Sequence, residues 1–217
     1  MERLCVWVVL ALSIALVDPG KAFGGEGSFV TVEELKRVLR TKNVDHIIET
    51  LNDVKIMRYQ GEILPFVEDL WVGKATDYQD LPLDIVNLLI VKVEFANILL
   101  QAERNGRIKT DRERMYRFVE PLVYSSDMQL AMSAILTLSL VDEERTTKAI
   151  VAVAEQENRA TFRAAVISLS WMCDPSARRG LEELIPRVKS GENKSIIRNT
   201  LQESESKKHK AGLCDRQ

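Results

Sequence analysis

The sequence predicts an all-α protein whose C-terminal half is a short right-handed α-solenoid of antiparallel helix pairs, with no sheet. Apolar residues recur at helical spacing along most of the chain, and no stretch alternates with the period of two that a strand requires. The region after residue 110 is also similar to itself at a fixed interval. Of the 217 residues, 46% are hydrophobic and 29% are charged, a composition typical of globular proteins.

Residues 1–22 have the pattern of a secretory signal peptide. Arg3 supplies a positive charge, an apolar stretch runs from Leu4 to Val17, and small residues precede a cleavage site after Ala22. The competing interpretation is an uncleaved anchor, but the stretch is shorter than the ~20 residues that span a bilayer. We therefore expect a periplasmic or secreted protein with no membrane span after cleavage.

Export changes the interpretation of the cysteines, because the mature chain keeps Cys173 and Cys214. In an oxidising compartment these two residues are candidates for a disulfide. The alternative is a buried Cys173 within a helix and an unpaired Cys214 on a mobile tail. The sequence leaves both possibilities open.

Residues 23–30 predict a glycine-rich flexible leader, and residues 31–104 predict an N-terminal helical part. Helices are expected to begin after the capping box at Thr31, and then at Val44, Glu62 and Pro82. The last of these helices runs to Arg104 and is apolar on nearly every face, but its charges favour a buried central helix over a membrane helix. This part consists either of divergent repeats or of a cap on the open end of a repeat array.

Residues 110–202 match themselves at two shifts, which differ by four positions. The shorter shift pairs Ile135 with Val166, and the longer shift pairs Arg163 with Arg198. Helix starts are predicted at two capping boxes and two aspartates, namely Thr110-x-x-Glu113, Ser126-x-x-Gln129, Asp142 and Asp174-Pro175. The remaining residues, 203–217, are polar and predict a disordered tail.

Two kinds of segment recur within these repeats. Val119-Glu120-Pro121-Leu122-Val123 and Leu184-Ile185-Pro186-Arg187-Val188 each place a proline in the first helix of a pair. Phe162-Arg163-Ala164-Ala165-Val166 and Ile197-Arg198-Asn199-Thr200-Leu201 each place an arginine before small and apolar residues in the second helix. These segments resemble HEAT repeats, and the resemblance covers about 110–202. It implies an armadillo-like stack whose second helices form a concave face.

No catalytic motif, phosphate-binding loop or metal-ligand spacing occurs, and the histidines His46 and His209 are remote from each other. We therefore expect no enzyme activity, no metal and no cofactor. A net charge of −2 gives no general attraction to nucleic acid, and nucleic acid is not an expected partner.

The expected partner is a protein or peptide held on the concave face. The candidate binding residues are Arg159, Arg163, Trp171, Lys194 and Arg198. The alternative is that the arginines bond within the stack and that the tryptophan is a partly buried core residue.

The leading functional hypothesis is an exported scaffold for protein–protein interaction. A second hypothesis is a protein that acts on a bound ligand, as the bilin lyases of the phycobilisome type do among helical-repeat proteins, or a chaperone. A third is a structural subunit of a cell-envelope complex that assembles through the apolar helix expected at 83–104.

Overall fold

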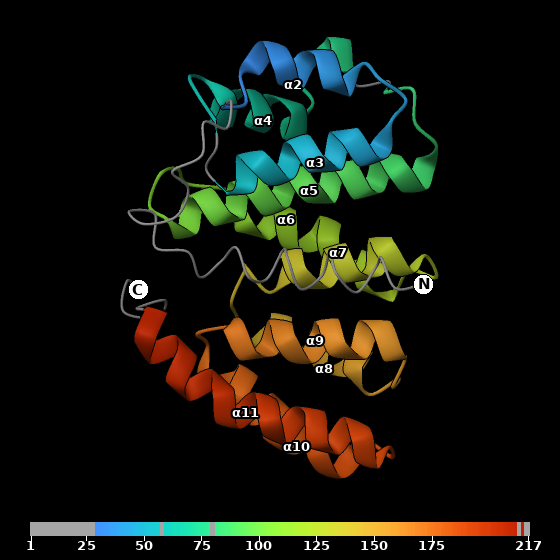
Figure 1. Cartoon of the computed structure of the whole chain (residues 1–217), viewed down its shortest axis with the longest axis vertical. Helices are drawn as coiled ribbons and strands as arrows, with labels where there is room; N and C mark the ends of the chain where they lie inside the picture. Colours follow the sequence, from blue (N-terminus) through green and yellow to red (C-terminus); the bar gives the residue numbers. More distant parts are fainter. Residues whose placement is uncertain (1–28, 57–58, 79–80, 212–213, 215–217) are drawn as a thin grey trace. The chain divides into compact units, whose positions relative to one another are not determined.

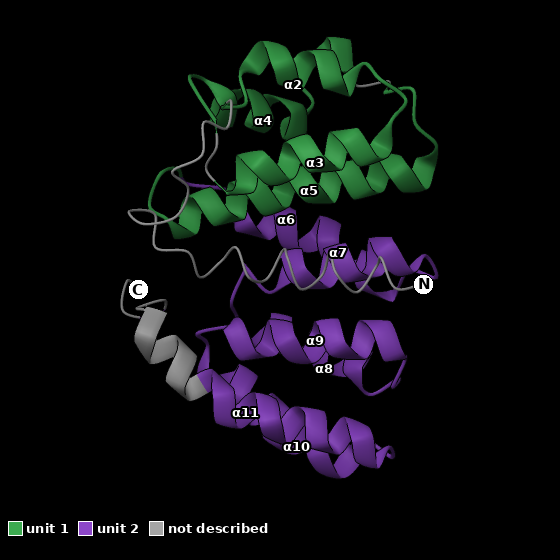
Figure 2. Ribbon diagram, in the orientation of Figure 1, with its two compact units in different colours: residues 1–108 green, residues 109–217 purple. Residues whose placement is uncertain are grey.

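The computed structural model describes residues 29–56, 59–78, 81–211 and 214. The expected signal peptide and residues 23–28 of the leader lie outside this part of the chain. Over the described residues the protein forms ten α-helices and no β-strand, which confirms the all-α class (Figure 1). The chain divides into two compact units, residues 1–108 and 109–217, which Figure 2 colours separately.

The first unit comprises α2 (Val32–Leu39), α3 (Val44–Lys55), α4 (Ile63–Val72), the 3-10 helix η2 (Thr76–Tyr78) and α5 (Ile85–Arg104). Thr31 caps α2 as predicted, because its hydroxyl accepts a hydrogen bond from the N–H of Glu34 at 3.2 Å. Asp84 caps α5 in the same way. The sequence analysis placed the start of this helix at Pro82, but α5 begins three residues later, at Ile85.

α5 is the central helix of the first unit and packs against α3 and α4. It is long and apolar enough to cross a membrane by length and composition alone, but most of it is buried. Glu94 of α5 is buried as well and forms an ion pair with Lys55 of α3. These observations agree with the expected buried central helix.

Val30, the last residue of the predicted flexible leader, is ordered in the structure instead. Its side chain is 3% exposed, and its backbone forms an isolated β-bridge with Tyr59. The carbonyl oxygen of Val30 accepts a hydrogen bond from the N–H of Gln60 at 2.9 Å. Burial of an apolar side chain and this backbone pairing both stabilise the ordered conformation.

The second unit has two layers of helices. The first-helix layer contains α6 (Arg112–Val119) with its continuation η3 (Glu120–Tyr124), α8 (Glu144–Ala154) and α10 (Pro175–Arg187). The second-helix layer contains α7 (Met128–Leu138), α9 (Arg159–Trp171) and α11 (Gly191–Ala211). Consecutive members of each layer contact each other, and each first helix contacts the second helix that follows it.

Aspartates cap three helices of this unit, with side chains that accept a backbone N–H from the first turn: Asp111, Asp127 and Asp174. The predicted start at Asp174-Pro175 is therefore confirmed. The capping boxes predicted at Thr110 and Ser126 are each wrong by one residue. The aspartate that follows each of them is an equally good cap, and its negative charge also favours the positive end of the helix dipole.

The helix starts define the length of the repeat. α6, α8 and α10 begin at 112, 144 and 175, and α7, α9 and α11 begin at 128, 159 and 191, so all intervals agree to within one residue and match the shorter shift. The longer shift is thus about one helical turn too long, and the predicted equivalence of Arg163 with Arg198 is wrong. An amphipathic helix moved by one turn still places apolar residues on apolar residues, so self-comparison detects both shifts.

The prediction of a disordered tail over 203–217 is also wrong for its first part. α11 continues to Ala211, so residues 203–211 are helical. Glutamate and lysine are frequent there and are strong helix formers. Cys214, which follows the helix, is bonded to Cys173.

Candidate protein-binding face

Ion pairs connect successive members of the first-helix layer. The guanidinium of Arg145 on α8 pairs with Glu113 of α6 and lies 4.1 Å from the ring centroid of Tyr116. Arg187 of α10 pairs with Glu155 at 2.8 Å. The hydrogen bonds to these carboxylates raise the pKa of both guanidinium groups, and the bond from Arg145 is the main cause that lowers the pKa of Glu113. These arginines are therefore engaged within the fold.

Two acidic residues with positive φ connect turns that are one repeat apart. Asp142 has a φ of 58° and Glu157 a φ of 51°. The carboxylate of Asp142 accepts hydrogen bonds from the backbone N–H of Cys173 at 2.8 Å and of Asp174 at 2.9 Å. The prediction that Asp142 caps its own helix is therefore wrong, because its carboxylate bonds to the turn one repeat later.

Glu157 forms the corresponding connection to α11. Its carboxylate accepts hydrogen bonds from the backbone N–H of Lys189 at 2.6 Å and of Ser190 at 3.0 Å, and from Nδ2 of Asn193 at 2.8 Å. The two backbone donors are the main cause that lowers the pKa of Glu157. A left-handed conformation costs an L-residue about 1–2 kcal/mol, which these hydrogen bonds help to offset.

The disulfide that the sequence left open is present in the structure. Cys173 and Cys214 are joined with a Cα–Cα distance of 5.4 Å. Cys173 lies in the turn between α9 and α10, where its own N–H donates to Asp142. The bridge thus fixes Cys214 to the turn that Asp142 already holds, and neither of these two cysteines has a free thiol.

The second-helix layer presents side chains at four-residue intervals along α7 and α9. On α7 and the turn after it these are Met128, Met132, Leu136 and Leu140, and on α9 they are Arg159, Arg163, Ile167 and Trp171. Residues four apart share one side of a helix, and the common interval between helix starts gives each member on α7 a counterpart on α9. We call these residues, together with Lys194 and Arg198 of the adjacent α11, the second-helix face.

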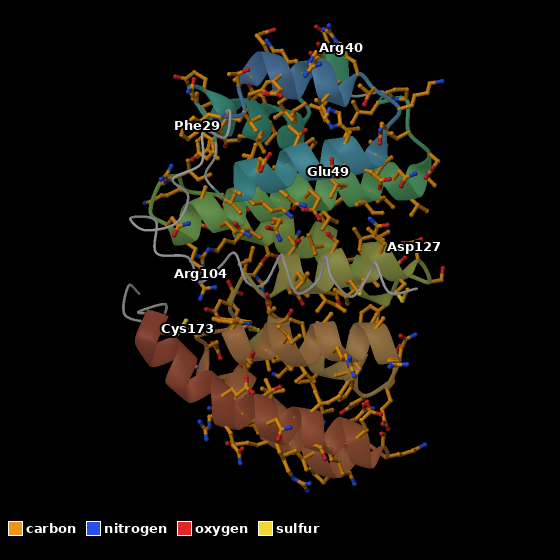
Figure 3. The ribbon with its side chains drawn as sticks, viewed as in Figure 1. Phe29, Arg40, Glu49, Arg104, Asp127 and Cys173 are labelled. Atoms are coloured by element: carbon orange, nitrogen blue, oxygen red, sulfur yellow. A yellow bond between two sulfur atoms is a disulfide. The ribbon has the colours of Figure 1, made fainter. Side chains whose placement is uncertain are left out.

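The second-helix face has an apolar half and a cationic half. The apolar half lies toward the C-terminal ends of α7 and α9. Its members are each half-buried: Leu136, Leu140, Ile167 and Trp171. The cationic half begins at the start of α9 with Arg159 and Arg163, which are exposed, and their counterparts on α7 are the exposed Met128 and the buried Met132. Figure 3 labels Asp127 at the start of α7 and Cys173 just after α9.

The charges of this face are not balanced within it. Neither α7 nor α9 contains an aspartate or glutamate. Arg163 lies 3.4 Å from Glu192 of α11, but Arg159 and Arg198 have no carboxylate partner among the side chains that the structure describes. Arg145 and Arg187 of the first-helix layer, by contrast, are paired with carboxylates.

The structure therefore places Arg159, Arg163 and Trp171 on one stripe. Lys194 and Arg198 lie on the neighbouring helix, where Lys194 is half-buried and Arg198 is exposed. The sequence analysis missed the apolar members on α7 and in the turn after it, and it also missed Ile167 on α9. The shorter shift would have found them, because it also pairs Leu136 with Ile167 and Leu140 with Trp171.

Nothing among protein-family models, curated proteins or solved structures matches this chain. Its own side chains supply the functional argument. Within the described residues no group of three or more His, Cys, Asp and Glu side chains is arranged to hold a metal ion. His46 is exposed in the first turn of α3.

A depression of about 430 Å³ lies on the first unit between α2 and η2. Two of its cations are engaged with neighbouring side chains. The ammonium of Lys36 pairs with Glu33 at 2.7 Å, and the guanidinium of Arg40 lies 5.4 Å from the ring centroid of Tyr78. It has less unpaired charge than the second-helix face and is the weaker candidate for a binding site.

Proposed function

We propose that the protein is an exported scaffold that binds a protein or peptide partner through the second-helix face, and that the second unit is a short right-handed α-solenoid. The observation that carries this proposal is the half-buried apolar patch beside exposed arginines, of which Arg159 and Arg198 have no carboxylate partner among the described side chains. Aromatic and arginine side chains are the residue types that most often dominate binding energy at protein interfaces. The regular interval between helix starts and the two layers support the solenoid.

A photo-crosslinking experiment tests the location of the binding face. Benzoylphenylalanine replaces Arg163 on the second-helix face or, as a matched control, Arg179, which is exposed on α10 in the first-helix layer. We expect irradiation in cells to give a discrete adduct from position 163 and not from position 179. The added substitution Ile167→Glu should remove the adduct, with helix content by circular dichroism as the folding control. The same adducts from both positions would contradict the proposal.

Export itself is proposed on two grounds, the N-terminal sequence pattern and the disulfide. Disulfides persist in oxidising compartments and are rare in the cytosol. Cleavage after Ala22 predicts a mature chain that begins at Phe23. N-terminal sequencing of the protein recovered from the periplasm or medium measures this directly, and a chain that still begins at Met1 would overturn it.

A second candidate, a structural subunit of an envelope complex, is favoured by the start of α5. Ile85 is 68% exposed, and Val86, Leu88 and Leu89 are half-buried. An apolar helix end of this kind is suited to subunit contact. Light scattering after size exclusion should then show an oligomer that Ile85→Glu dissociates, and a monomeric wild-type chain would count against this candidate.

A further inference from the structure

We propose that the partner segment is acidic and amphipathic, with apolar side chains that pack on Leu136, Ile167 and Trp171 and carboxylates that pair with the arginines beside them. This inference rests on the proposed function and specifies the chemistry of the partner. It is carried by the charge complementarity between the cationic second-helix face and an acidic partner.

The apolar half sets the spacing of the partner's apolar residues. Leu136 and Leu140 are four residues apart, as are Ile167 and Trp171, which corresponds to ~6 Å along a helix axis. Packed helices lie ~8–10 Å apart, so the two rows form a patch wide enough for two or three apolar side chains. A short amphipathic segment carries such a row on one side.

The cationic half sets the charge of the partner. Arg163 lies one turn and Arg159 two turns before Ile167 on α9, and Arg198 lies on the adjacent α11. A guanidinium group presents paired N–H donors that match a carboxylate, so acidic residues beside the apolar row meet these groups. A basic segment would place like charges against them and would be rejected.

The absence of acidic residues from α7 and α9 makes this preference selective. Every charged side chain on these two helices is positive. The carboxylate of Glu192 on α11 pairs with the guanidinium of Arg163 at 3.4 Å. The exposed arginines of α10, in contrast, lie on a helix that also carries Glu182 and Glu183. The second-helix face is therefore the part of this unit where an acidic segment meets the least repulsion.

The experiment uses three short fluorescein-labelled peptides with identical apolar positions and with glutamate, glutamine or lysine at all other positions. Fluorescence anisotropy measures their binding to the mature chain, residues 23–217, at physiological ionic strength. We expect the glutamate peptide to bind about tenfold more tightly than the glutamine peptide and the lysine peptide to bind least. The variant Arg159→Glu/Arg163→Glu should reverse this order. The matched variant Arg114→Glu/Arg179→Glu, which changes exposed arginines of the first-helix layer, should keep it.

The outcomes separate this inference from the proposed function. Equal binding of all three peptides, abolished by Ile167→Glu, overturns the acidic preference and leaves the binding face in place. No binding of any peptide to a folded chain contradicts both proposals. Tighter binding of a single-stranded oligonucleotide that is insensitive to Ile167→Glu would assign the arginines to a nucleic acid and overturn the inference.

Discussion

Reduction of the Cys173–Cys214 disulfide is expected to destabilise the second unit by up to about 4 kcal/mol. The bridge spans 41 residues of sequence, and the entropy of closing a loop of that length in the unfolded chain corresponds to about 4 kcal/mol at 25 °C. This value is an upper limit. After reduction the end of α11 can fray, because its sequence from Ser204 to Lys210 has no apolar residue, and fraying returns entropy to the folded state.

Urea unfolding followed by circular dichroism, with and without reductant, measures the effect. Two variants isolate the bridge: Cys214→Ser, and a chain that ends at Ser204. If the terminal residues act only through the bridge, both variants should have the stability of the reduced wild type, and neither should respond to reductant. An unfolding midpoint of the wild type that reductant leaves unchanged would refute the reasoning. A truncated chain clearly less stable than Cys214→Ser would show that these residues stabilise the unit by other contacts.

Three further predictions follow from the packing and charges. The pKa of Glu157 is lowered from its ordinary 4.5 in the folded chain, so its carboxylate stabilises the fold above that pH, and this contribution is lost as pH falls through the folded-state pKa. Urea unfolding at a series of acidic pH values should show a smaller pH dependence for Glu157→Gln, and an unchanged one would contradict this role. Gly180→Ala places a Cβ 2.9 Å from a valine methyl of α8, so overpacking of about 1–3 kcal/mol should exceed the helix-propensity gain of about 1 kcal/mol. The control Gly191→Ala meets no atom within 4 Å and should not destabilise, so equal stability of the two variants would refute close packing at Gly180. Lys55→Met leaves Glu94 buried without its cation and should cost about 3–5 kcal/mol, while adding Glu94→Leu should recover most of the loss, and a double variant no more stable than the single one would argue against the pair.

The binding-face residues were only partly predictable from sequence. Arg163 was selected because it recurs with Arg198 at the longer shift, an equivalence that the structure does not support, and Trp171 was selected because aromatic residues are typical anchors at interfaces. Leu136 and Ile167 were missed because half-buried and fully buried apolar residues have the same sequence signature. The adjacent pair Ile135 and Val166 matches equally well at the shorter shift, yet both are fully buried.

The sequence by itself determined the helical class, most helix starts and the existence of a repeat in the second unit, because capping and amphipathic periodicity depend on residues within one or two turns. Only the tertiary structure decided between the shorter and the longer shift, since they differ by about one turn and bury the same side of each helix. The tertiary structure alone also placed the carboxylates of Asp142 and Glu157 on turns one repeat away, and it left Arg159 and Arg198 without carboxylate partners among the described side chains. Those outcomes depend on which side chains of distant segments meet, and no local pattern encodes that meeting.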